Sequence, residues 1–277
     1  MLQRLVKATN QWMPTAMAFH CCRILASRPP RAEVSAAEQA ALAQASRLFE
    51  LDWSNDAAWS WGSGPTVVLI HGWGGRAAQM APLAVELARS GLRAVAFDVA
   101  GHGESAEPSA GWEYSIRDIA KVSRQLGSVA GYVGHSAGGL SLMAARRIHG
   151  LSPAKYVCVC APSHPYPPVR GLAQRLDPRP SVLQRYRTYL GAQFQTDWRS
   201  LEAGAAYLGA GDDLLLCYDR KDRFVDPDDG NRIHALCPGS RLLTSDAYGH
   251  TRILRATEVM REIAKFLNDE ASRIAAA

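Results

Sequence analysis

The chain has 277 residues and a formal net charge of +5, with 47% hydrophobic and 21% charged residues. This composition is ordinary for a folded globular protein and excludes a disordered or fibrous one, and no run of about 18 apolar residues predicts a membrane-spanning helix. The six cysteines are few for this length and lie mostly in apolar runs, so we expect free thiols, no disulfide framework and a reducing, cytoplasmic location.

The excess positive charge comes from the first 32 residues, which contain five basic side chains and no acid. Residues 1–26 also place apolar side chains near helical spacing, interrupted at Pro14, which predicts an amphipathic arm. We expect the arm to pack on its own fold or on a second subunit of a homo-oligomer. Weak contact with a membrane surface is the alternative, and a targeting segment is disfavoured because no clean apolar region follows the basic start.

Nucleic acid is not an expected partner, because no basic stripe with interleaved aromatic residues crosses the main part of the chain. Ser35-x-x-Glu38 predicts a capping box for a helix reaching about Glu50, and Ser115-x-x-Asp118 predicts the start of another helix. Further helices are expected at 77–90, after 136, at 229–236 and at 257–268, and strands at 66–70, 93–97, up to about 133, 156–160, 214–218 and 242–244. Strands that alternate with helices indicate an α/β fold, with a mostly parallel central sheet covered by helices on both faces.

One interval, residues 163–211, breaks this alternation between two core strands. It contains six aromatic residues and six arginines against three acidic residues. We interpret it as a small helical cap insertion whose arginines form a solvated face or favour an anionic substrate. The predicted organisation is an N-terminal helical arm at 1–60, a core at 61–162 and 212–277, and the cap at 163–211.

The pentapeptide Gly134-His-Ser-Ala-Gly138 matches the pattern G-x-S-x-G. A nucleophile held on a sharp turn between a strand and a helix has a strained backbone, so its flanking positions must lack bulky side chains. Taken alone, the pentapeptide is also compatible with a serine in a glycine-rich turn. Its position between a predicted strand and a predicted helix favours Ser136 as a nucleophile.

A serine nucleophile needs a base to take its proton and a carboxylate to orient that base. Asp222 follows the strand predicted at 214–218, and His250 follows the last predicted strand, at the edge where open α/β sheets place their sites. We therefore predict Ser136, His250 and Asp222 as the catalytic residues. The rivals are His164 for the base, and Asp219, Asp226 and Asp228 for the acid.

In these features the chain resembles the α/β-hydrolase family over about residues 60–270. His71-Gly-Trp-Gly-Gly75 resembles the oxyanion loop of that family, and Asp98-x-x-Gly-His-Gly-x-Ser105 resembles its next strand-end motif. The resemblance implies that the backbone N–H groups of Trp73 and Ala137 form an oxyanion hole. The segment Phe224–Pro227 resembles the turn that follows the acid in the family.

Other polar residues in these motifs are predicted to be structural. We expect His71 to stabilise its loop, His135 to flank the nucleophile and Asp98 to close a turn beside the site. Cys158 and Cys160 are expected on one face of a strand, but no second pair completes a metal site.

The expected reaction is acyl transfer in two steps, in which water finally releases the acid from an acyl-enzyme. The expected partner is a small-molecule acyl substrate, and neither a cofactor nor a metal is needed. Thioesterase, amidase or acyltransferase activity on the same three residues remains an alternative, as does non-catalytic binding of a small ligand.

Overall fold

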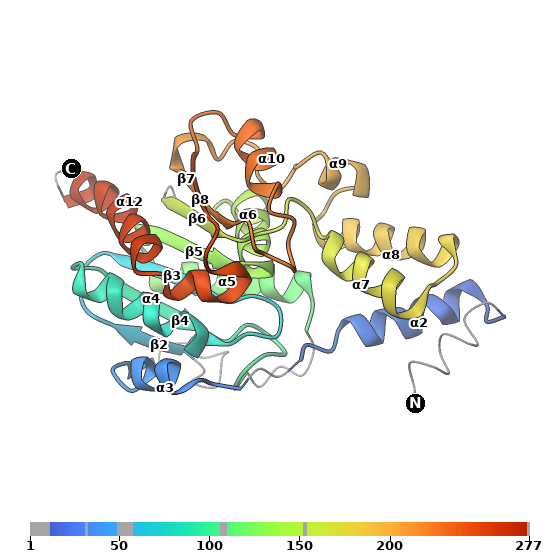
Figure 1. Ribbon diagram of the computed structural model, residues 1–277, viewed down its shortest axis with the longest axis horizontal. Helices are drawn as coiled ribbons and strands as arrows, with labels where there is room; N and C mark the ends of the chain where they lie inside the picture. Colours follow the sequence, from blue (N-terminus) through green and yellow to red (C-terminus); the bar gives the residue numbers. More distant parts are fainter. Residues whose placement is uncertain (1–11, 31–32, 49–57, 106–109, 152–153, 276–277) are drawn as a thin grey trace.

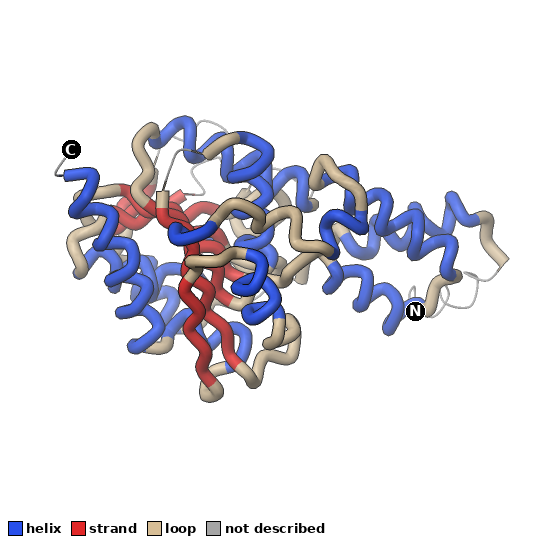
Figure 2. Tube along the Cα trace, turned by 90° about the horizontal axis from the view of Figure 1, so that it is seen from above, coloured by secondary structure: helices blue, strands red, loops and turns tan. Residues whose placement is uncertain are grey.

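A computed structural model describes residues 12–30, 33–48, 58–105, 110–151 and 154–275, without the side chains of 270–275. A sheet with helices on both faces makes up the larger part of the molecule, and a helical lobe projects from it (Figure 1, Figure 2). The predicted α/β architecture is confirmed. No helix in the described ranges is long and apolar enough to span a bilayer.

The central sheet has the strand order β1-β2-β4-β3-β5-β6-β7-β8. Strands β3 to β8 run parallel to one another, and β1 and β2 add an antiparallel edge. The strands are β1 Ser46–Arg47, β2 Ala58–Trp61, β3 Thr66–Ile70, β4 Arg93–Phe97, β5 Gly131–His135, β6 Lys155–Val159, β7 Leu214–Asp219 and β8 Arg241–Ser245. Every residue of β3, β5, β6 and β7 is buried, as continuous apolar runs in a doubly covered sheet predict.

Two helical layers cover the sheet. Successive residues of β3 point to opposite faces, so Val67 and Leu69 join one hydrophobic cluster while Val68 and Ile70 join the other. The first cluster includes side chains of α4 (Ala77–Arg89) and α12 (Thr257–Ala275). The second includes side chains of α5 (Trp112–Leu126), α6 (Ala137–His149) and α10 (Asp229–Leu236).

The projecting lobe combines part of the N-terminal arm with the segment between β6 and β7. Its helices are α2 (Thr15–Ala26), α7 (Tyr166–Leu176) and α8 (Pro180–Gln193), and the shorter α9 (Trp198–Glu202) follows. Ala18 and Cys22 of α2 are buried in a cluster with Leu172, Val182 and Leu190. The described part of the arm therefore packs on helices of its own chain, whereas residues 1–11 lie outside the described residues.

The helix expected from Ser35 to about Glu50 is shorter than predicted. Its capping box is present, with both reciprocal hydrogen bonds between Ser35 and Glu38, but α3 (Ala36–Leu42) ends early. The indole of Trp61 donates to the carbonyl of Ala41 at 2.9 Å, and the chain then turns into β1. The sheet therefore begins inside the range assigned to the arm, because tertiary pairing with β2 competes with extension of the helix. Glu50 lies outside the described residues.

Two other local predictions are wrong. Helix α5 begins at Trp112, and Asp118 does not cap it because its carboxylate accepts a hydrogen bond from the amide of Ala100 at 2.9 Å. Cys160 lies beyond β6 with a φ of 47°, so its side chain joins the cluster opposite that of Cys158. In both cases a loop at the edge of the sheet determines the geometry.

Candidate active site

Ser136 lies on a strained turn between β5 and α6. Its φ of 52° is in the left-handed region, and its amide donates to the carbonyl of Val159 at 2.8 Å. A Cβ atom added at Gly138 would lie 2.3 Å from the carbonyl oxygen of His71, and one added at Gly134 would lie 2.5 Å from the Cα of Gly139. The pentapeptide thus needs its glycines for close backbone approach.

The three predicted catalytic side chains come together beyond the carboxyl ends of the parallel strands. His250 Nε2 lies 3.0 Å from Ser136 Oγ, and His250 Nδ1 lies 2.6 Å from a carboxylate oxygen of Asp222. These residues follow β5, β7 and β8, whose carboxyl ends share one edge of the sheet. The side chains of His250 and Asp222 are 13% and 1% exposed. The sequence prediction therefore names residues that form one hydrogen-bonded chain.

The environment of Asp222 keeps its carboxylate charged. Burial acts to raise its pKa, but hydrogen bonding and charge interaction with His250, together with amide donors, shift the pKa below its usual value. The other carboxylate oxygen accepts from the amides of Phe224 at 2.7 Å and Val225 at 2.9 Å. An ionised Asp222 favours the tautomer with a proton on His250 Nδ1, which leaves Nε2 free to accept the proton of Ser136.

The loop that carries His250 is fixed by two neighbouring groups. Asp219 accepts from the hydroxyl of Ser245 at 2.7 Å and from the amides of Ala247 and Tyr248. Burial acts to raise the pKa of Asp219, but these and other hydrogen bonds lower it to about 2. The ring of His135 donates from Nε2 to the carbonyl of His250 at 2.9 Å.

His135 is suited to this donor role because it stays neutral. Burial, followed by the effect of His250, lowers its pKa to about 3. Asp219, a rival for the acid, thus holds the loop of His250, while Asp222 contacts the imidazole.

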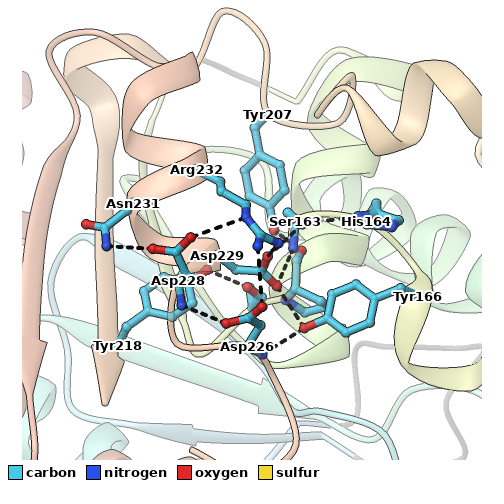
Figure 3. Close-up of polar contacts among 12 residues, drawn as sticks. Ser163, His164, Tyr166, Tyr207, Tyr218, Asp226, Asp228, Asp229, Asn231 and Arg232 are labelled. Carbon is cyan, nitrogen blue, oxygen red and sulfur yellow. Dashed lines mark hydrogen bonds and ion pairs between the residues drawn. The ribbon is translucent and has the colours of Figure 1, made fainter. Parts of the chain in front are cut away.

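The remaining rivals belong to a second polar cluster, shown in Figure 3. Asp229 is buried and accepts from Ser163 Oγ at 2.8 Å and from the hydroxyl of Tyr166 at 2.9 Å. His164 Nδ1 lies 3.1 Å from Ser163 Oγ. Asp226 and Asp228 form ion pairs with Arg232.

This cluster joins the start of the inserted segment to α10. The sequence analysis named three of its members, His164, Asp226 and Asp228, as rivals for the catalytic residues, but it did not predict that they form a separate cluster with Ser163 and Asp229. Tyr207 and Tyr218 support it from the core, because their hydroxyls donate to the carbonyls of Pro162 and Ala161.

The predicted oxyanion residues lie beside Ser136. Trp73 and Ala137 line one small cavity of about 10 Å³, together with Gly72 and Trp112 among others. Ala137 opens α6, where a backbone N–H has no partner within the helix. A Cβ added at Gly72 would lie 2.9 Å from the Cβ of Ser136, so the loop after β3 passes directly against Ser136.

His71 and Asp98 brace this loop. The amide of Val99 donates to His71 Nε2 at 3.1 Å, and His71 Nδ1 donates to the carbonyl of Gly72 at 2.8 Å. Asp98 accepts from the amides of Ala77 at 2.6 Å and Glu104 at 2.7 Å. Burial lowers the pKa of His71 to about 4 and raises that of Asp98 to about 6. Both side chains connect loops at the edge of the sheet, as expected for structural residues.

One group of side chains in the described residues has metal-ligand chemistry. Donor atoms of Cys160, Asp222 and His250 lie within 4.8 Å of one another. Burial, followed by the charge of Asp222, raises the pKa of Cys160, which disfavours the thiolate that a metal requires. His250 Nδ1 and Asp222 Oδ2 are 2.6 Å apart. Two donor atoms that each lie about 2.0–2.2 Å from a tetrahedral ion are farther apart than this. The arrangement fits a proton relay better than a metal centre.

Comparison with known proteins shows the family of this chain. The model described as "Alpha/beta hydrolase family" matches residues 67–268, so the chain belongs to that family. A search of curated proteins finds no significant match.

Solved structures of several enzymes share the fold. A thermophilic esterase from Thermogutta terrifontis is 19% identical to this chain, with a TM-score of 0.58. The match covers 78% of this chain and 93% of the esterase chain. A monoacylglycerol lipase from Paleococcus ferrophilus is 20% identical, with a TM-score of 0.57, and the match covers 77% of this chain and 98% of the lipase chain. A bromoperoxidase from Bacillus anthracis is 19% identical, with a TM-score of 0.59, and the match covers 76% of this chain and 95% of the bromoperoxidase chain. At these identities the likeness shows the fold, and the reaction must be argued from the site.

Proposed function

We propose that the protein is a serine hydrolase that cleaves a carboxylic ester of a small or medium-sized substrate. The supporting observation is the continuous chain of hydrogen bonds from Ser136 through His250 to the buried Asp222. The strained turn at Ser136 adds to it, because backbone strain of this kind clusters at functional sites. A binding protein without catalysis would have no need of this combination.

The reaction follows from the order of the three side chains. His250 Nε2 takes the proton of Ser136 as its oxygen attacks the ester carbonyl, and the amides of Trp73 and Ala137 stabilise the charge on the carbonyl oxygen. His250 then gives the proton to the leaving alcohol, which departs as the C–O bond breaks. Water enters, loses a proton to His250 and attacks the acyl-enzyme, and Ser136 recovers its proton as the carboxylic acid leaves.

The test is a burst experiment with a short-chain p-nitrophenyl ester. The wild-type protein should release about one equivalent of p-nitrophenol rapidly and should be labelled by a fluorophosphonate, whereas Ser136→Ala should do neither. The matched control is Ser163→Ala, which removes another serine hydroxyl close to a histidine and an aspartate. A normal burst in Ser136→Ala protein would refute the assignment.

Thioester and amide substrates, and transfer of the acyl group to another alcohol or amine, use the same three residues. A panel of esters, thioesters and amides with one common acyl group ranks these reactions by kcat/KM. Absence of fluorophosphonate labelling in folded wild-type protein would favour the binding role.

A further inference from the structure

The loops that carry Asp222 and His250 enclose a second, larger depression. Its volume is about 590 Å³, and Asp222, Phe224, Gly249 and His250 contribute to its lining. Four basic residues complete the lining: Arg220, Lys221, Arg223 and Arg252. Three of these follow β7 and one follows β8, so two segments that are distant in sequence bring their positive charges to one place.

The basic residues in the lining of this depression outnumber the acidic ones. The four basic residues are exposed, and none forms an ion pair with an acidic side chain of the described ranges. Asp222 is the one acid in the lining, and it is buried and engaged by His250. Convergent cations in a concave surface attract anions more strongly than scattered surface charges do.

The depression adjoins His250, which protonates the leaving alcohol in the proposed reaction. In the proposed reaction His250 delivers a proton to the departing alcohol, and His250 lines the depression. The small cavity with Trp73 and Ala137 lies instead at the nucleophile and oxyanion side. The basic residues therefore stand where the alcohol portion of an ester would lie. The ring of Phe224, which is 65% exposed and centred 5.2 Å from that of His250, gives this region an apolar wall.

The loop that bears Arg223 is held in place by two side chains of the inserted segment. Arg170 of α7 donates to the carbonyl of Phe224. The hydroxyl of Tyr166, also on α7, accepts from the amide of Asp226 at 2.8 Å while it donates to Asp229 (Figure 3). A loop that is already ordered loses little conformational entropy when a ligand binds to it.

We propose that this depression is an anion-binding subsite, and that the enzyme prefers esters whose leaving alcohol carries a carboxylate or phosphate group. This inference rests on the proposed hydrolase function. It places anion recognition on the loops after β7 and β8, whereas the sequence analysis considered the arginines of the inserted segment either a solvated face or the groups that favour an anionic substrate.

The test compares two esters that differ in charge but hardly in size, 4-acetoxybenzoate and the neutral 4-acetoxybenzamide. The wild-type protein should show a higher kcat/KM for the carboxylate. The double variant Arg223→Gln/Arg252→Gln should lower the ratio of the two kcat/KM values about 5- to 20-fold, because an exposed charge pair changes an equilibrium about two- to fivefold. The ratio between proteins cancels the different intrinsic reactivities of the esters.

The matched control is Arg124→Gln, which removes an exposed arginine on α5 outside the depression. It should leave the ratio unchanged. A ratio that is the same in the double variant and the wild-type protein would overturn the proposal. A further measurement with 4-acetoxyphenyl phosphate distinguishes phosphate from carboxylate as the preferred group. Either preference supports the subsite if the double variant loses that preference.

Failure of the subsite is distinguishable from failure of the hydrolase assignment. Calorimetric binding of 4-hydroxybenzoate reports the subsite without turnover, and fluorophosphonate labelling reports Ser136 without the subsite. Binding of 4-hydroxybenzoate that is lost in the double variant supports the subsite even if neither ester is cleaved. No binding to the wild-type protein and no preference for the anionic esters would reject it.

Discussion

Two clusters among the described residues combine serine, histidine and aspartate, and their connections differ. In the first, Ser136 contacts His250 Nε2 and His250 Nδ1 contacts Asp222, so the imidazole lies between the hydroxyl and the carboxylate. In the second, Ser163 donates directly to Asp229, and His164 lies to one side of Ser163. Figure 3 shows Asp229 surrounded by donors, with Arg232 among them.

The comparison teaches that the residue types alone do not define a hydrolase site. A proton can move from Ser136 to His250 because the opposite nitrogen of the ring faces a carboxylate that stabilises the resulting imidazolium. The hydroxyl of Ser163 donates its hydrogen bond to Asp229 and has no base placed between them. The first arrangement suits proton transfer, and the second suits anchoring of the inserted segment to α10.

The largest expected difference between the clusters is in catalysis. We expect His250→Ala to lower kcat on a p-nitrophenyl ester by at least about 10³-fold, because it removes the base for both steps. His164→Ala, the matched variant of the second cluster, should change kcat less than about threefold. Steady-state kinetics on folded protein measure both, and equal losses in the two variants would contradict the division of roles.

The two aspartates should separate activity from stability. Asp222→Asn is expected to lower kcat about 10²- to 10⁴-fold, because an amide no longer fixes the histidine tautomer. Asp229→Asn should keep kcat of the folded protein within about fivefold. It should instead lower the free energy of unfolding by about 2–4 kcal/mol, since buried donors lose a charged acceptor.

Urea unfolding followed by circular dichroism measures the stabilities of these two variants. A strong catalytic loss in Asp229→Asn with unchanged stability would reverse the interpretation of the second cluster.

A smaller effect concerns Asp219, a carboxylate close to the first cluster that supports a loop. Its pKa of about 2 is below the unfolded value of about 3.9, so its stabilising effect is present above about pH 4 and is lost as the pH falls through about 2. We expect Asp219→Asn to lower the free energy of unfolding by about 1–3 kcal/mol at pH 7. The difference from wild type should shrink between pH 4 and pH 2.

Urea titrations at several pH values test this window. The control is Asp246→Asn, an exposed neighbour, which should shift stability by less than about 0.5 kcal/mol. A difference for Asp219→Asn that persists unchanged at pH 2 would contradict the role of its charge.

Much of the fold was predictable because its signals are local. Continuous apolar runs such as Thr66–Ile70 and Leu214–Tyr218 are typical of strands buried on both faces, and both lie in observed strands. The glycines around Ser136 signal a backbone turn that excludes side chains. The positions of Asp222 and His250 after strands were equally visible, because parallel strands place their carboxyl ends at one edge.

Other predictions failed where a distant group competes with a local one. The side chain of Asp118 had the right spacing for a cap, but it binds Ala100 instead. Helix α3 ends at Leu42 because the chain that follows pairs as strand β1 with β2. The indole of Trp61 also donates a hydrogen bond to the carbonyl of Ala41, near the end of the helix. Neither competitor is close in sequence, so no short pattern reveals it.

The sequence by itself determined the parallel sheet, the strained serine turn and the family, because apolar periodicity and glycine sterics act over a few residues. Only the tertiary structure decided that His250 contacts Asp222 and that His164 contacts Ser163. It also decided that basic residues after β7 and β8 share one depression. Hydrogen bonds and charge interactions act over a few ångströms in space, and the fold alone sets which residues come that close.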